Sequence, residues 1–208
     1  MRIAFALYPR FTALDLIGPY NILAYGPNVT TQLVAATMEA VSADVGTLRI
    51  PPDATFDDAE QPDVIVVPGG PGWKRIADDE ALTSWLKRAA PSAQWVTSVC
   101  TGAFALAGAG LLEGRRATTH WAAHEHLANY GAVPTKERVV TDGHVVTGAG
   151  VSAGIDMALT LAASLWDEDT AKAIQLANEY DPRPPYDCGS PDTAPAHVVD
   201  AMRALLGS

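Results

Sequence analysis

Residues 95–106 read WVTSVCTGAFAL and pass from an apolar, β-branched run directly into a run of small residues. The first half is typical of a buried strand and the second half of a closely packed helix. Cys100 stands at the junction. A sharp strand-to-helix turn of this kind, a nucleophile elbow, exposes its side chain at the carboxyl end of a sheet, where helix N-terminal N–H groups favour negative charge on sulfur. On this segment alone, a buried structural cysteine is an equally good interpretation.

The rest of the chain alternates short apolar runs with segments of helical spacing, which favours an α/β fold with a mostly parallel sheet. The predicted strands are residues 3–7, 33–36, 64–67 and 95–99, and the predicted helices are residues 80–90, 103–111, 122–130 and 153–166. Asp142-Gly143 predicts a type I′ hairpin between residues 139–141 and 144–147. A last amphipathic helix is expected over residues 196–206. We expect one domain, residues 1–208, including a C-terminal extension of about 180–208.

Composition narrows the class of partner. The 208 residues carry a formal net charge of -10 and are 48% hydrophobic, so no basic face is available for nucleic acid or a membrane surface. The first residues lack the pattern of a signal peptide, and no run of about 18 apolar residues occurs. We therefore expect a cytoplasmic protein with a small-molecule partner. Cys100 and Cys188 are not expected to pair, and Cys188 is interpreted as structural or incidental.

A second strand also ends in a conspicuous loop, since residues 64–72 read VIVVPGGPG. The carboxyl ends of parallel strands meet at the ligand crevice of an open sheet. Pro71 has no amide hydrogen, so the predicted donor in this loop is the N–H of Gly70, with the N–H of Thr101 as its partner in an oxyanion hole. The loop fits neither phosphate-binding fingerprint, which argues against a nucleotide site.

A carboxylate lies between apolar neighbours in residues 14–19, LDLIGP. A helix cap or a surface position is the ordinary interpretation of Asp15. If Asp15 instead faces Cys100, burial and a nearby thiolate would both raise the pKa of the carboxyl group. The two side chains could then share one proton.

These segments, with several others, resemble the ThiJ/PfpI superfamily and, within it, the isonitrile hydratases. The resemblance covers essentially the whole chain. Its marks are LDLIGP at 14–19, PGG at 68–70, TSVCTG at 97–102, RATTHW at 116–121, GAGVSAGID at 148–156, EYDP at 179–182 and GSPDTAP at 189–195. The cysteine turn and the RATTHW segment occur across much of the superfamily, including ligand-binding domains of transcription regulators. The Asp15 segment and the tail point to a narrower group of proteins within it.

The resemblance implies a flavodoxin-like three-layer sandwich, like that of class I glutamine amidotransferases, and usually a homodimer with active sites near the interface. It also implies hydration of isonitriles, R–NC, to N-substituted formamides without a metal or an organic cofactor. Cys100 would form a covalent thioimidate and Asp15 would move protons, with Thr101 beside the nucleophile. Gly150 and Val151 match a loop expected to line the pocket.

Two other functions stay open at this point. A glyoxalase or deglycase of the same superfamily is the nearest alternative, although such relatives commonly use a glutamate on the first helix. A small-molecule or oxidant sensor is the non-enzymatic alternative. His120 and Trp121 are candidates for the pocket wall, and the spacing of His124 and His126 gives no metal pair.

Overall fold

The apolar runs assemble into one central sheet in the computed structural model, which describes residues 1–206. Its strand order is β10-β11-β7-β6-β1-β2-β5, and all neighbouring strands are parallel except β10 and β11. The strands are β1 (Arg2–Ala6), β2 (Thr30–Ala35), β5 (Ala54–Thr55), β6 (Val64–Val67), β7 (Trp95–Val99), β10 (Val139–Asp142) and β11 (Val145–Gly148). Two small sheets pair β3 (Val41–Ser42) with β4 (Arg49–Ile50), and β8 (Arg116–Ala117) with β9 (Val133–Pro134).

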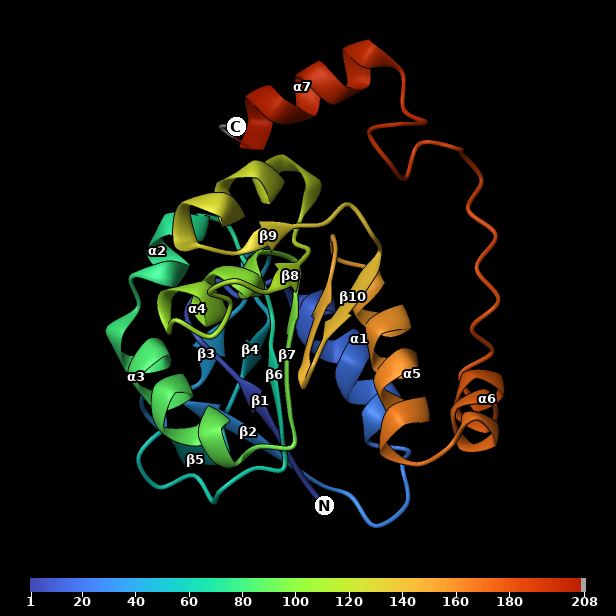
Figure 1. The fold of residues 1–208 in the computed structure, drawn as a ribbon. Coiled ribbons are helices and arrows are strands. Elements are labelled where there is room, and N and C mark those ends of the chain that lie inside the picture. Colours follow the sequence, from blue (N-terminus) through green and yellow to red (C-terminus); the bar gives the residue numbers. More distant parts are fainter. Residues whose placement is uncertain (207–208) are drawn as a thin grey trace.

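Helices cover both faces of this sheet (Figure 1). One layer contains α1 (Ala13–Leu23), α5 (Ala153–Leu165) and α6 (Glu168–Ala177), and the other contains α2 (Trp73–Ala77), α3 (Glu80–Ala89) and α4 (Ala103–Gly108). Short 3₁₀ segments are η1 (Ala90–Ser92), η2 (Cys100–Gly102) and η3 (Trp121–Tyr130). The arrangement confirms the predicted flavodoxin-like sandwich.

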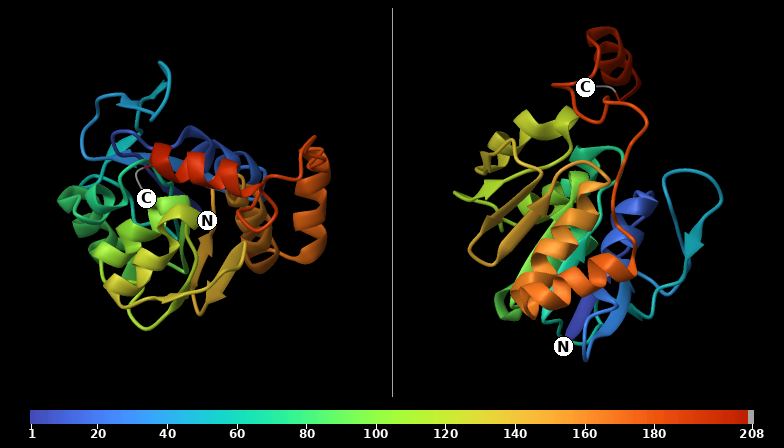
Figure 2. Two further views of the ribbon diagram at one scale, coloured as in Figure 1. Left: turned by 90° about the horizontal axis from the view of Figure 1, so that it is seen from above. Right: turned by 90° about the vertical axis from the view of Figure 1, so that its right-hand side faces the viewer.

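The last helix, α7 (Ala196–Leu206), stands apart from these layers. An extended segment runs from α6 along one side of the molecule and carries α7 over the edge where the parallel strands end (Figures 1 and 2). The predicted extension of 180–208 thus contains the expected helix with the expected bounds, and its last two residues lie outside the described part. None of the helices formed by residues 1–206 has the length and apolar character of a membrane span.

Several sequence predictions need correction. The segment 122–130 forms a 3₁₀ rather than an α-helix, and α4 ends at Gly108 instead of residue 111. The hairpin is confirmed, but Asp142 pairs with Val145, so its turn is Gly143-His144. Only Gly143 has a positive φ there, at 61°, which is the pattern of a type II′ rather than a type I′ turn.

The helices α1 and α6 escaped prediction for different reasons. Gly18 and Pro19 lie inside α1 and weaken its helical pattern. Gly18 nevertheless suits the packing here, because a Cβ there would lie 3.1 Å from Cγ1 of Ile155 on α5, a tight contact. In contrast, α6 is short and largely exposed, with Ala171 and Ile174 as its buried residues.

The cysteine turn packs so closely on β6 that Gly102 tolerates no side chain. A Cβ at this position would lie 2.3 Å from the carbonyl oxygen of Val67 and 2.7 Å from that of Pro68. We expect Gly102→Ala to lower the free energy of unfolding by about 2–3 kcal/mol, measured by urea denaturation. Gly189→Ala is the control, since its new methyl group meets no atom within 4 Å. An equal, negligible change in both variants would contradict this close packing.

Candidate active site

The predicted site residues come from four neighbouring strand ends. Asp15 lies in the first turn of α1 after β1, the glycine loop follows β6, and Cys100 follows β7. The loop of residues 149–152 joins β11 to α5. Since β11, β7, β6 and β1 are adjacent and parallel, their carboxyl ends bring these segments to one edge of the sheet.

Cys100 adopts the strained backbone expected of a nucleophile elbow. Its φ of 55° lies in the left-handed region, which costs a residue with a side chain about 1–2 kcal/mol. Two hydrogen bonds hold this conformation: the Cys100 N–H donates to the carbonyl of Ala149 at 2.9 Å, and Thr119 Oγ1 donates to the carbonyl of Cys100 at 2.7 Å. The side chain is only 5% exposed. The surrounding loops therefore enforce the turn.

Asp15 is fully buried and faces the glycine loop rather than solvent. Its Oδ2 accepts a hydrogen bond from the N–H of Gly69 at 2.9 Å. Its Oδ1 is buried without a conventional hydrogen bond among residues 1–206, and the Cys100 thiol interacts with the carboxyl group. The helix N-cap is Thr12, so the capping interpretation of Asp15 is wrong.

Gly69 shows how closely the three segments approach one another. A Cβ at this position would lie 2.6 Å from the backbone nitrogen of Thr101, 2.7 Å from Asp15 Oδ2 and 2.8 Å from Cys100 Cβ. The carboxyl group, the nucleophile turn and the first N–H of that turn therefore surround one point. Any side chain at Gly69 would separate them.

Burial dominates the electrostatics of this site. It raises the pKa of Asp15 to about 7, against the opposing effect of the Gly69 N–H, and the charge of Asp44 raises it further. Burial, followed by the negative charge of Asp15, raises the pKa of the Cys100 thiol well above its usual range. Near neutral pH, the pair thus keeps one proton on sulfur while the carboxyl group is about half ionised.

Two backbone N–H groups counteract this rise at sulfur. The N–H groups of Thr101 and Val151 both donate toward the Cys100 side chain and lower its pKa. Thr101 follows the nucleophile in its own turn, whereas Val151 precedes the N-terminus of α5. They form a pair of donors for negative charge at the position of the sulfur.

The structure corrects the donor assigned to Gly70. Its N–H donates to Thr101 Oγ1 at 2.8 Å, and the same hydroxyl donates to the Gly70 carbonyl at 2.6 Å. Pro71 has no N–H to donate, and the Thr101 hydroxyl occupies the N–H of Gly70, a contact between loops that the sequence does not reveal. Val151, expected only to line the pocket, supplies a second N–H at the sulfur beside that of Thr101.

His120, Trp121 and Gly150 lie at the outer side of this site. A Cβ on Gly150 would be 3.0 Å from Cδ2 of His120, so the glycine lets the imidazole pack against the loop that carries Val151. Burial lowers the pKa of His120, and its Nδ1 accepts a hydrogen bond from the Ala122 N–H. The ring is therefore neutral near pH 7, and Trp121 packs beside it at 5.6 Å between centroids.

Sequence reasoning missed three residues that support the pair. Tyr8 is a buried phenol whose hydroxyl donates to the Pro68 carbonyl at 2.8 Å, and burial, then the charges of Asp15 and Cys100, raises its pKa. Gly69 and Thr119 both lie within quoted motifs, but their roles depend on contacts between loops. No sequence motif marks Tyr8, because it directly follows the apolar residues of the first strand.

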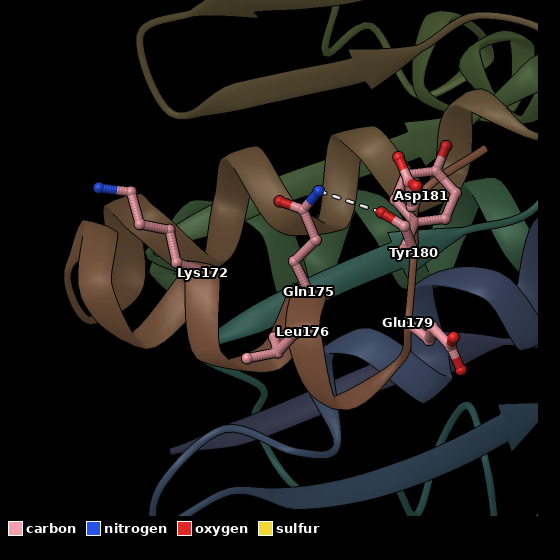
Figure 3. Close-up of a pocket in the computed structure, with 6 residues that line it drawn as sticks. All are labelled: Lys172, Gln175, Leu176, Glu179, Tyr180 and Asp181. Atoms are coloured by element: carbon pink, nitrogen blue, oxygen red, sulfur yellow. Dashed lines mark hydrogen bonds between the residues drawn. The ribbon is translucent and has the colours of Figure 1, made fainter. Parts of the chain in front are cut away.

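One cavity of the fold lies away from this site. A cavity of about 250 Å³ lies along the exposed side of α6, where Gln175 donates to the Tyr180 carbonyl at 3.1 Å (Figure 3). None of the catalytic candidates lines it. Within residues 1–206, no three His, Cys, Asp or Glu side chains gather in a way that could hold a metal ion.

Comparison with known proteins identifies the family to which this site belongs. Residues 1–164 match the DJ-1/PfpI family. The chain belongs to the DJ-1/PfpI family. It is 50% identical over 203 residues to an isonitrile hydratase of Pseudomonas putida, which spans 98% of this chain and 89% of the relative. A more distant family member is a deglycase of Pyrococcus horikoshii, 28% identical over 71% of this chain and 89% of that protein.

A solved structure extends the family likeness to the tail. The crystal structure of a ThiJ/PfpI family protein from Pseudomonas syringae is 40% identical and superposes with a TM-score of 0.95, covering 99% of this chain and 86% of that one. The resemblance derived from the motifs is thereby confirmed. In this family member, the superposition includes most of the segment beyond residue 164.

The raised pKa of Asp15 predicts a pH-dependent cost to folding. Because the folded-state pKa of about 7 exceeds the ordinary value of 3.8, the group costs nothing below pH 3.8, destabilises the fold progressively as pH rises from 3.8 to about 7, and keeps this full cost at higher pH. Relative to wild type, Asp15→Asn should gain up to about 4 kcal/mol in free energy of unfolding at pH 8 and much less at pH 4.

Denaturation with urea at several pH values measures this difference. Asp57→Asn is a suitable control, because that side chain is 87% exposed on the surface. A stability gap for Asp15→Asn that does not change between pH 4 and pH 8 would show that Asp15 ionises normally in the folded protein.

Proposed function

We propose that this protein is an enzyme that hydrates isonitriles to N-substituted formamides through a covalent intermediate on Cys100. The observation that carries the proposal is the buried pairing of the Asp15 carboxyl with the Cys100 thiol around Gly69. The relative that shares half of its residues over nearly the whole chain is an isonitrile hydratase, which supports the same reaction. Cys100, Asp15 and Thr101 are the proposed catalytic residues.

In the first step, the sulfur and the proton of the thiol both add to the terminal carbon of R–NC. The Asp15 carboxylate takes the proton of the Cys100 thiol as the sulfur forms its bond to that carbon. The resulting carboxylic acid delivers the same proton to the carbon. The product is a thioimidate, R–N=CH–S–Cys100, and Asp15 is again a carboxylate.

The second step consumes water. Asp15 accepts a proton from the attacking water as the water oxygen bonds to the thioimidate carbon, and Asp15 then passes this proton to the nitrogen. The tetrahedral intermediate, R–NH–CH(OH)–S–Cys100, then collapses to R–NH–CHO as the carbon–sulfur bond breaks. The hydroxyl proton passes through Asp15 to the sulfur, which leaves Asp15 a carboxylate and Cys100 a thiol. The net change is R–NC plus H₂O giving R–NH–CHO. No electrons are exchanged with another molecule, so the scheme requires no redox cofactor.

The backbone donors have a defined place in this scheme. The N–H groups of Thr101 and Val151 stabilise negative charge on sulfur when the thiol loses its proton and when the thiolate leaves. Gly70 holds the Thr101 side chain through two hydrogen bonds, and Gly150 admits the neutral His120 beside Val151. These two glycines are therefore proposed to position the site rather than to contact the reacting carbon.

We also propose that the protein works as a cytoplasmic homodimer, and that residues 180–208 belong to the same functional unit as the sandwich. Both cysteines within the described part of the chain are free, as a reducing compartment favours. Leu14 and Ile17 on α1 are 45% and 44% exposed on either side of Asp15, a surface suited to contact with a second copy.

Formamide production tests the proposal directly. Wild type should convert benzyl isonitrile to N-benzylformamide, whereas Cys100→Ala should lose at least about 1,000-fold in rate because no covalent intermediate can form. Acid quenching should reveal a mass increase on the Cys100 peptide equal to the whole isonitrile, since the addition has no leaving group. Equal rates in wild type and Cys100→Ala would eliminate the assignment.

The pH profile tests Asp15 as the base. Since the carboxylate form accepts the thiol proton, kcat/KM should rise through an apparent pKa of about 7. The charge of Asp44 raises that pKa, so in Asp44→Asn the rising limb of the kcat/KM profile should move to lower pH. The exposed Asp57→Asn should leave the limb in place. If the rise of kcat/KM with pH had the same apparent pKa in Asp44→Asn and in wild type, the base role argued for Asp15 would be contradicted.

A further inference from the structure

Apart from Tyr180, whose hydroxyl donates to Asp156, the described part of the tail is partly buried in only one place. Of residues 181–206, four are half-buried and the others are exposed. Those four residues all line one cavity of about 160 Å³ beneath α7: Ser190, Ala194, Val198 and Val199. Figures 1 and 2 show α7 carried to this position by the extended segment that follows α6. The contact between the tail and the rest of the fold is thus organised around this cavity.

The wall of the cavity that faces the tail is formed by residues at the outer side of the candidate active site. His120 and Trp121 line it, and the guanidinium of Arg203 on α7 lies 6.0 Å from the Trp121 ring. His120 follows Thr119, whose hydroxyl is bonded to the Cys100 carbonyl at 2.7 Å. The His120 ring also lies against Gly150, in the loop that carries Val151. His120 therefore borders both the cavity and the loops around the nucleophile.

The lining of the cavity favours a neutral, apolar occupant. No Asp, Glu, Lys or Arg is among the residues that line it, and most of them are aliphatic or aromatic. The apolar members are Trp121, Pro191, Ala194, Val198, Val199, Met202 and Leu206. The neighbouring imidazole is neutral. An apolar cavity of about 150 Å³ is large enough for a benzene ring, so this one can hold a six-membered ring.

The chemistry of the substrate requires such a subsite. The R–N≡C group is linear and reacts at its terminal carbon, so the R group must extend away from Cys100. We propose that the cavity between η3 and α7 is the subsite for the R group, and that it selects isonitriles with an apolar ring or branched substituent. This proposal rests on the proposed function. It assigns the tail a direct part in substrate selection, with Ala194, Val199 and Met202 as specificity-determining residues.

Substitutions that fill or enlarge the cavity test this assignment. Ala194→Leu and Val199→Phe should lower the ratio of kcat/KM for benzyl isonitrile to that for methyl isonitrile by at least about tenfold. Met202→Ala should raise the ratio for naphthylmethyl over benzyl isonitrile several-fold. Leu205→Phe is the matched control on the same helix, since Leu205 is 76% exposed and lies outside the cavity. Its ratios should stay within twofold of wild type.

The outcomes separate the subsite from the reaction. If wild type converts isonitriles but the three variants retain wild-type ratios, the subsite is wrong and the proposed function stands. If wild type produces no formamide from any of the isonitriles, both the proposed function and the proposed subsite are wrong. Thermal unfolding verifies that each variant is folded. Should the filling variants fail to fold, Met202→Ala decides alone, because its 38%-exposed side chain can be shortened with little effect on the core.

Discussion

The structure depends on keeping two ionisable side chains, Asp15 and Cys100, in one space from which water is excluded. Each group alone would cost free energy at this depth, because burial disfavours the charged form of both. Together they can hold one proton between them. The Gly69 N–H satisfies one carboxylate oxygen, and the N–H groups of Thr101 and Val151 face the sulfur. The arrangement is costly for stability and well suited to proton transfer at neutral pH.

The parallel sheet makes this arrangement possible by bringing separate loops to one edge. The positive φ of Cys100 is maintained by bonds to Ala149 and Thr119, which belong to other segments of the chain. Gly69 and Gly102 allow the loops to approach within distances that a Cβ would prevent. The chain therefore places a strained residue and two close backbone approaches where the chemistry is proposed to occur, and the regular core supports both.

Sequence patterns predicted the parts of this fold that depend on local chemistry. The strands β6 and β7, the turn at Cys100 and the helix α7 follow from apolar runs and periodicity. Contacts between distant loops were beyond the same reasoning: the Thr101 hydroxyl occupies the Gly70 N–H, and the backbone of Val151 supplies the donor that was assigned to Gly70. The cavity beneath α7 was equally hidden, since its two walls are some 70 positions apart in the chain.

The central claim is that Asp15 and Cys100 titrate as one buried pair. The most direct measurement is a ¹³C NMR titration of the Asp15 carboxyl carbon in wild-type protein, with the signal assigned by its absence in Asp15→Asn. Burial of the pair should give a midpoint of about 7. A midpoint near the ordinary aspartate value of 3.8 would contradict the claim, because the carboxyl group would then ionise as it does in water rather than as a group buried beside the thiol.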